Sequence, residues 1–290
     1  MATRQLLEAT APHEQKLPNK LHAMKTDLRN FLKSAAALTI VAVVMPFAAM
    51  GADATKQVAN ASIDLTPPAD GIKVLIVTGD DYPGHPWRQT APTLKAILEK
   101  DPRLKVRIVE DPNALASPQL KDWDVVVLHF MDWEKPGPGP AARTNLQKFV
   151  ASGKGMMLTH FACGAWDNNE WPEFKNLAGR VWFGANGGRQ HDPHGKFTVE
   201  IADPEHPITK GMTSFETLDE LYTCLTGDAP IHVVAKATSK VDKKEYPMAF
   251  VLNYGQGRVF HTVLGHDTRA YASPGVEELL RRGCVWASGN

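Results

Sequence analysis

Histidines follow four segments of the chain that are typical of buried strands. The segments are the apolar runs at 73–79, 123–130, 156–161 and 258–264, and the histidines at or just after their ends are His85, His129, His160 and His266. Histidine titrates near neutral pH and binds metals, so it can act as a general acid, a general base or a ligand. Ligands of open α/β sheets bind beyond the carboxyl ends of the strands. These positions therefore predict a functional site.

We expect His160 to be the main catalytic residue, because it lies at a sharp turn from a strand into a helix. His266 is followed by Asp267, and a neighbouring carboxylate can orient an imidazole. The alternative for both histidines is a packed side chain that bonds to nearby backbone, with Asp267 capping its own turn. We predict catalytic roles for His160, His266 and Asp267.

Asp219 and Glu220 are a pair of adjacent acids in a later segment of the chain. Adjacent side chains of a strand point to opposite faces, so only one of the two can face a pocket. We predict that Glu220 is the one that faces the pocket and that it has a catalytic role. Imidazoles and a carboxylate are ligands that zinc prefers, so a divalent metal such as zinc is expected. The predicted metal ligands are His160, His191 and His266.

Further residues near the predicted strand ends are candidates for substrate binding. Glycines there let the backbone approach a ligand closely, and aromatic rings can stack on the apolar face of a sugar. His191 lies in such a glycine-rich loop, at 187–194, where cradling a substrate is an alternative to binding a metal. The predicted substrate-binding residues are Thr78, Gly79, His85, Trp133, His191 and Tyr222.

Strand-like and helix-like segments alternate from residue 71 onward. Strands are predicted at 73–79, 104–109, 123–130, 156–161, 197–201, 231–237, 248–253 and 258–264, and helices at 87–99, 141–151 and 276–286. This alternation predicts an α/β fold with a mostly parallel sheet and helices on both faces. The last two strands flank Tyr254-Gly255-Gln256-Gly257, a tight turn that predicts a C-terminal β-hairpin.

Several motifs in a fixed order resemble the ThuA (trehalose utilisation) family over about residues 71–289. They lie at 73–84, 153–160, 203–211, 219–222, 254–260 and 264–267. The resemblance implies a three-layer, flavodoxin-like fold of the class I glutamine amidotransferase type, and a role in catabolism of trehalose or related disaccharides. Amidotransferases of this type carry a cysteine nucleophile in a Gly-x-Cys-x-Gly turn. Here His160 is at that turn and Cys163 lacks those glycines, so glutamine hydrolysis is not expected.

The first 70 residues are predicted to be a targeting segment followed by a linker. Residues 1–23 read as a non-native or mis-called extension, and residues 24–54 as a signal peptide with basic residues, an apolar run and small residues for cleavage. An uncleaved membrane anchor and a cytoplasmic protein are the alternatives. Residues 55–70 read as a linker into a domain at 71–290. The expected location is the periplasm or outside the cell. Disulfides form in such oxidising compartments, so the sequence leaves undecided whether two of the three cysteines are bridged.

The charge balance narrows the classes of partner. Lys plus Arg and Asp plus Glu both number 32, which argues against nucleic-acid binding. We expect a small sugar or glycoside as partner, no nucleotide cofactor, and no membrane contact after signal cleavage. The sequence does not decide whether the chain forms a homo-oligomer. The favoured function is a hydrolase or isomerase of disaccharides or glycosides. The alternatives are a non-catalytic carbohydrate-binding domain, and a hydrolase of non-sugar substrates that uses Cys163 or an activated water.

Overall fold

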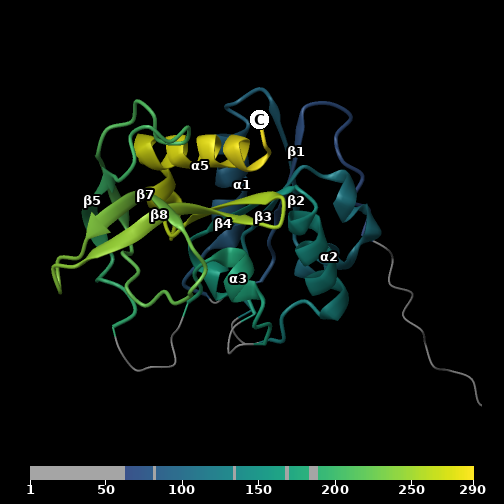
Figure 1. Cartoon of the computed structure of the whole chain (residues 1–290), viewed down its shortest axis with the longest axis horizontal. Helices are drawn as coiled ribbons and strands as arrows, with labels where there is room; N and C mark the ends of the chain where they lie inside the picture. The colour runs from purple at the N-terminus through teal and green to yellow at the C-terminus, as the bar shows by residue number, and fades with distance from the viewer. Residues whose placement is uncertain (1–62, 81–82, 133–134, 167–169, 183–188) are drawn as a thin grey trace, which may run out of the picture. The chain divides into compact units, whose positions relative to one another are not determined.

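The computed structural model describes residues 63–290, except 81–82, 133–134, 167–169 and 183–188. Its strands form one nine-stranded sheet in the order β2-β1-β3-β4-β9-β8-β7-β5-β6 (Figure 1). The strands are β1 (Ile72–Val77), β2 (Leu104–Val109), β3 (Val125–Leu128), β4 (Gly155–Thr159), β5 (Gly195–Ile201), β6 (Phe215–Asp219), β7 (His232–Thr238), β8 (Glu245–Tyr254) and β9 (Gly257–Thr262). The mixed α/β class is thus confirmed.

One half of the sheet is parallel and its strands are apolar on both sides. In β1, Val74 and Ile76 pack into one hydrophobic core, while Leu75 and Val77 pack into a second core on the other face. A strand with both faces buried needs a continuous apolar run, as Ile72–Val77 provides. The parallel pairs join β2 to β1, β1 to β3, β3 to β4, and β4 to β9.

The other half of the sheet is antiparallel, so the sheet is less parallel than the sequence predicted. The pairs β9–β8, β8–β7, β7–β5 and β5–β6 all run antiparallel. β8 and β9 pair from Ala249–Thr262 to Tyr254–Gly257 around a tight turn. The sequence reason is visible in β5, which alternates buried and exposed residues, as strands with one solvated face do.

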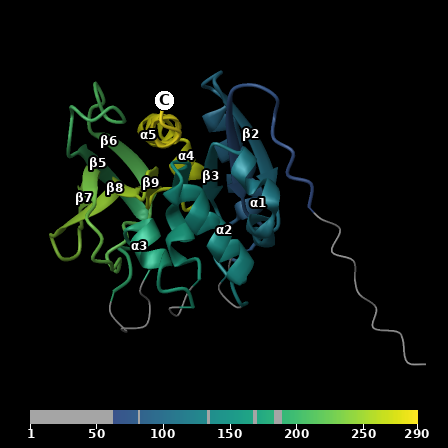
Figure 2. The ribbon, with the colours of Figure 1, turned by 45° about the vertical axis from the view of Figure 1, so that its right-hand side comes forward.

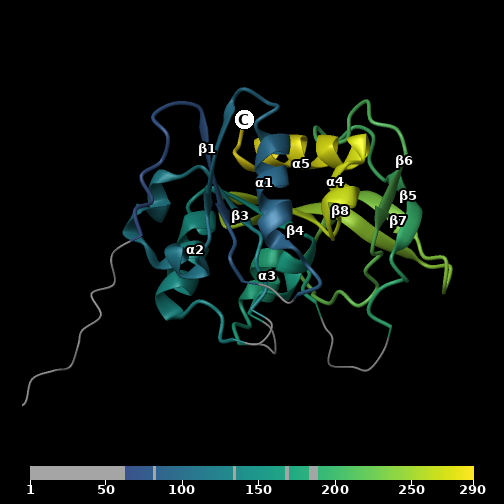
Figure 3. The same ribbon diagram turned by 180° about the vertical axis from the view of Figure 1, so that it is seen from behind.

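Helices cover the two faces of the sheet (Figures 2 and 3). Residues of α1 (Trp87–Leu98), α4 (Thr268–Tyr271) and α5 (Pro274–Ala287) pack into the core that contains Val74. Residues of α2 (Pro140–Ala151) and α3 (Phe174–Ala178) pack into the core that contains Leu75. Three of these helices match the predicted ones, whereas the short α3 and α4 were not predicted. Single turns of 3-10 helix lie at Pro112–Ala116, Pro118–Asp122 and His160–Gly164.

The segment before β1 is more closely tied to the domain than a linker would be. Leu65 is fully buried, and its carbonyl accepts a hydrogen bond from the Trp123 indole at 3.0 Å. The end of the predicted linker is therefore part of the domain. The predicted extension and signal peptide, residues 1–54, lie outside the described residues.

Two further features bear on the sequence predictions. The three cysteines, Cys163, Cys224 and Cys284, form no disulfide with one another, so the disulfide that the sequence left undecided is not formed. No helix within the described part of the chain combines the length and the apolar character that a membrane span requires.

Candidate functional site

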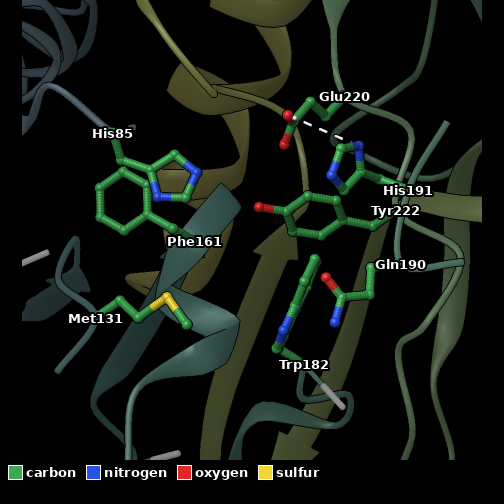
Figure 4. A pocket seen from close by; sticks show the side chains of 8 residues that line it. All are labelled: His85, Met131, Phe161, Trp182, Gln190, His191, Glu220 and Tyr222. Carbon is green, nitrogen blue, oxygen red and sulfur yellow. Dashed lines mark ion pairs between the residues drawn. The ribbon is translucent and has the colours of Figure 1, made fainter. Parts of the chain in front are cut away.

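A pocket of about 200 Å³ lies at the carboxyl ends of the parallel strands (Figure 4). His85 follows β1, Met131 follows β3, Phe161 follows β4, and Glu220 follows β6. In Figure 4, His85, Phe161 and Met131 form one wall, and Tyr222, Gln190 and Trp182 form the opposite one. The lining residues are His85, Met131, Phe161, Trp182, Gln190, His191, Glu220 and Tyr222.

His160 occupies a strained turn directly after β4. Its φ angle is +41°, a left-handed value that side-chain-bearing residues rarely adopt and that is often found at functional sites. The side chain is fully buried, and Nδ1 lies 2.7 Å from the Val263 carbonyl oxygen. A carbonyl only accepts, so Nδ1 carries the proton and donates it. Nε2 is then the lone-pair nitrogen of the neutral ring, and it accepts the Tyr222 hydroxyl at 2.8 Å.

Four side chains converge beside the pocket on atoms that can bind a metal. His85, His160, Glu220 and His266 each offer one ligand atom, and these atoms all lie within 4.8 Å of one another. Glu220 Oε2 is 3.4 Å from His266 Nδ1 and 3.7 Å from His160 Nε2. We call this group the histidine–glutamate cluster. It unites residues from three parallel strand ends with one acid from the antiparallel edge.

The cluster contains groups whose pKa values are shifted in opposite directions. Burial lowers the pKa of His160, and burial followed by the nearby His266 lowers that of His85 to about 3. Burial also opposes ionisation of Glu220, but attraction to the neighbouring His160 and His266 outweighs it and lowers the pKa of Glu220. For His266, burial is likewise outweighed, here by Glu220, and the pKa is raised. The arrangement favours an ionised Glu220 beside imidazoles.

Asp219 fixes the cluster in place rather than contributing to it. It is fully buried, and its carboxylate accepts backbone N–H groups from Gly265 at 2.7 Å, Glu220 at 2.8 Å and His266 at 3.1 Å. These bonds tie the end of β6 to the loop after β9. Asp219 and Glu220 thus serve different purposes, as the alternation of strand side chains predicted.

The donors of the cluster fit a divalent ion of the zinc type. Zinc binds imidazole nitrogen and carboxylate oxygen, and its histidine ligands commonly donate their second N–H to a carbonyl. The bond from His160 Nδ1 to Val263 is such a bond. His266 Nδ1 is buried and has no hydrogen-bond partner within the described residues, which leaves it available to an ion. We therefore regard the cluster as a candidate metal site.

A second group, His194, His266 and Asp267, fits an ion less well. Asp267 caps α4 by accepting the Arg269 N–H at 2.8 Å, and it also pairs with the Arg269 guanidinium. The same guanidinium lies 3.5 Å from His194 Nε2. A resident cation at this position repels a metal ion, and the carboxylate is already engaged.

The remaining predicted site residues are placed differently. His191 lines the pocket with Nδ1 3.7 Å from Glu220 Oε1, but it is not in the cluster. Thr78 is fully buried at the end of β1, and Gly79 packs against the backbone of Glu110; neither lines the pocket. Trp133 lies outside the described residues.

His129, the fourth strand-end histidine, is a buried packing residue. Its Nε2 is 2.8 Å from the Thr90 hydroxyl and its Nδ1 is 2.7 Å from the Thr159 hydroxyl. Its ring centroid lies 4.7 Å from that of Phe161, which in turn stacks on His85 at 4.8 Å. His129 is therefore a buried residue that packs against the pocket wall.

Sequence reasoning assigned no role to Met131, Phe161, Trp182 or Gln190. Phe161 directly follows His160 and Met131 lies two residues after His129, which was a usable signal. Trp182 and Gln190 come from the long connection between α3 and β5, and no local pattern marks them.

Two acidic or thiol groups near the strand ends have unusual environments. Cys163 is buried, which raises its pKa well above the ordinary value and disfavours a reactive thiolate. Asp132 follows β3; one carboxylate oxygen accepts the Trp166 N–H at 2.8 Å, and the other has no hydrogen-bond partner among the described residues. Burial, with Glu170 and Asp80 nearby, raises the pKa of Asp132 to about 6.

The fold and the pocket define an α/β protein with a histidine–carboxylate site at the carboxyl ends of its strands. The sequence profile of the ThuA family, described as trehalose utilisation, matches residues 73–287. The chain belongs to this family, as its motifs predicted. Membership supports a sugar-related role.

Solved structures agree with this assignment. The chain is similar to a ThuA-like protein from Parabacteroides merdae ATCC 43184, with 26% identity and a TM-score of 0.65 over 76% of this chain and 90% of that one. A ThuA-like protein from Bacteroides uniformis ATCC 8492 shares the fold at 20% identity, with a TM-score of 0.60 over 74% and 89% of the two chains. A search among curated proteins finds no match to the chain.

Proposed function

We propose that the protein is an enzyme of disaccharide or glycoside catabolism, a hydrolase or isomerase assisted by a divalent metal such as zinc. The observation that carries this proposal is the histidine–glutamate cluster at the pocket. A domain that only binds neutral sugars needs amides and aromatic rings, not three imidazoles and a carboxylate around one point. The proposal includes a class I amidotransferase-type fold in which His160 takes the place of the usual nucleophile.

The pocket supports a neutral, ring-sized ligand. Its volume of about 200 Å³ is below the range of roughly 300–1,000 Å³ that drug-sized ligands occupy, so it suits one sugar ring better than two. Among the described residues, the lining contains a carboxylate but no lysine or arginine, so none of them offers a permanent cation to bind a phosphate. Phe161 and Trp182 offer apolar surface to the carbon face of a ring, while Gln190 and Tyr222 offer polar groups to its hydroxyls.

The roles of the chain's own residues follow from their positions. An ion held by His85, His160, Glu220 and His266 supplies Lewis acidity toward a substrate oxygen. Asp219 holds Glu220 and the loop of His266 in register, and the Val263 carbonyl holds His160 in one tautomer. His191, beside Glu220, faces the bound sugar from the pocket lining.

The first test is the metal content of the chain, purified without a metal-affinity step. We expect about one zinc or similar ion per chain, and a melting temperature that rises when zinc is added to stripped protein. His160→Ala and Glu220→Gln should lose the ion. His206→Ala, which removes a histidine that is not in the cluster, is the matched control and should keep it. Absence of both the ion and the thermal response would remove the metal from the proposal.

The second test separates an enzyme from a binding domain. The aromatic wall of Phe161, Trp182 and Tyr222 favours sugar binding even without catalysis, so a non-catalytic carbohydrate-binding domain is the alternative. Wild-type protein and His160→Ala should be incubated with disaccharides and glycosides, and both binding and product should be measured. Turnover that His160→Ala abolishes supports the enzyme. Equal binding by both proteins without product from either supports the alternative.

We also propose that the domain acts in the periplasm or outside the cell after removal of residues 24–54. The support is the basic and apolar pattern of that segment. N-terminal sequencing of the protein recovered from an exporting host tests this. A mature chain that starts near residue 55 is the expected result, and an intact chain in the cytoplasm would contradict it.

A further inference from the structure

The hydroxyl of Tyr222 occupies the one atom of His160 that a metal ion requires. Imidazole has two ring nitrogens, and Nδ1 of His160 is committed to the Val263 carbonyl at 2.7 Å. Only Nε2 offers a lone pair, and the Tyr222 hydroxyl donates to it at 2.8 Å. One lone pair cannot accept a proton donor and bind an ion at the same time. The hydrogen bond and the ion therefore exclude each other.

Neither ring can leave this contact easily. The ring of His160 is fully buried, and it lies 5.2 Å from His85 and 5.3 Å from His266 between ring centroids. The ring of Tyr222 packs edge-on against Trp182 at 4.6 Å, and its backbone pairs with His191. The hydroxyl oxygen lies 2.8 Å from Nε2, whereas a zinc–nitrogen bond is about 2.0–2.1 Å long, so an ion on Nε2 would overlap this oxygen. The ion can therefore bind only when the whole Tyr222 hydroxyl is displaced from Nε2 against this packing.

The Tyr222 hydroxyl has a second direction available to it, toward the ligand. Tyr222 lines the pocket, and Figure 4 shows its oxygen pointing into the space between His85 and Glu220. A sugar in this pocket presents hydroxyl and ring oxygens that accept hydrogen bonds. The same O–H can therefore serve His160 or the sugar.

We propose that Tyr222 couples metal binding to sugar binding. Its O–H bonds to His160 Nε2 when the cluster holds no ion, and the displaced hydroxyl bonds to an oxygen of the bound sugar when an ion takes that nitrogen. The inference rests on the proposed metal-assisted function. By thermodynamic linkage the coupling is reciprocal, so an ion should tighten sugar binding and a sugar should tighten ion binding.

The test is a zinc titration of stripped wild-type protein, Tyr222→Phe and Tyr254→Phe at one pH. Tyr222→Phe has no hydrogen bond to break before zinc binds. A typical hydrogen bond corresponds to a change of roughly two- to twelvefold in an equilibrium constant, and we expect zinc to bind tighter by that factor. Tyr254 is the matched control, because its hydroxyl is also bonded, to Gln147 at 2.8 Å and Glu173 at 2.5 Å, outside the pocket lining. Tyr254→Phe should bind zinc like the wild type.

A spectroscopic readout accompanies the titration, and its wild-type part does not depend on how well Tyr222→Phe folds. Zinc should change the near-ultraviolet tyrosine absorption of the wild type, because one phenol loses its imidazole partner. The change should persist in Tyr254→Phe and vanish in Tyr222→Phe. Equal or weaker zinc binding by Tyr222→Phe, or a wild-type spectrum that zinc leaves unchanged, overturns the coupling but not the metal site. If neither the wild type nor Tyr222→Phe binds zinc, the coupling and the metal-assisted function both fail.

Discussion

Asp219→Asn should destabilise the protein measurably, although the substitution removes no volume. The carboxylate accepts three backbone N–H groups in a fully buried position, from Gly265, Glu220 and His266. Glu220 and His266 share Oδ1, whereas Gly265 uses Oδ2. An asparagine that keeps an oxygen at Oδ1 must place its NH2 group against the Gly265 N–H. Two donors then face each other without an acceptor.

The magnitude follows from the group that is left unsatisfied. A buried N–H without an acceptor costs about 1–3 kcal/mol. Burial raises the pKa of Asp219, so removing its charge returns part of that cost. We expect a net loss of about 2 kcal/mol in the free energy of unfolding, which corresponds to a melting temperature lower by roughly 4–8 °C for a domain of this size.

Urea denaturation followed by circular dichroism measures this change. Asp111→Asn is the matched control, because Asp111 makes a similar bond, to the Asn113 N–H, at an exposed helix cap where asparagine serves equally well. That variant should stay within about 0.5 kcal/mol of the wild type. Asp219→Asn should also bind zinc more weakly, since Glu220 and His266 lose their common anchor. Wild-type stability in Asp219→Asn would refute the positioning role of Asp219.

Three further predictions concern buried positions outside the cluster. Asp132 has a pKa of about 6, so the folded state holds its proton more tightly than the unfolded state, and stability should fall as pH rises from about 4 to 6. Asp132→Asn should therefore match the wild type near pH 4 and exceed it by roughly 2 kcal/mol at pH 8, as urea denaturation at the two pH values will show; a gain independent of pH would contradict the assignment. Cys163→Ala should keep the turnover and zinc affinity of the wild type, because a buried thiol is a poor nucleophile; loss of turnover with the fold intact would favour a cysteine hydrolase instead. Gly283→Ala should lower the free energy of unfolding by about 1–3 kcal/mol, because the added methyl group would lie 2.2 Å from the buried Phe260 ring; an unchanged denaturation midpoint would show that the ring moves aside freely.

Local patterns were sufficient for most of the elements and for part of the site. The apolar run of β1 and the helical spacing of α1 and α5 are properties of neighbouring residues, so they could be read before any tertiary contact was known. The placement of His160 and His266 at strand ends was predictable for the same reason. The antiparallel half of the sheet was not predictable, because the directions in which β5, β6 and β7 pair depend on the whole chain.

Which residues make up the site is decided by the tertiary structure and not by the local sequence. His85, predicted to bind substrate, joins the cluster, whereas His191, predicted to bind metal, lies beside it. His129 has the same local sequence signal as His160, yet it ends between two threonines. Side-chain direction at a strand end depends on the turn that follows, and the turns differ.

The sequence by itself determined the ThuA family, the α/β elements and the residue types that could do chemistry. The tertiary structure alone decided which of those residues meet and in what state. Glu220 reaches His160 from the end of β6, the edge strand of the antiparallel half, and the tautomer of His160 depends on a carbonyl 103 residues further along the chain. Contacts between residues so far apart follow from how the strands pair and how the chain packs, and no local pattern encodes either.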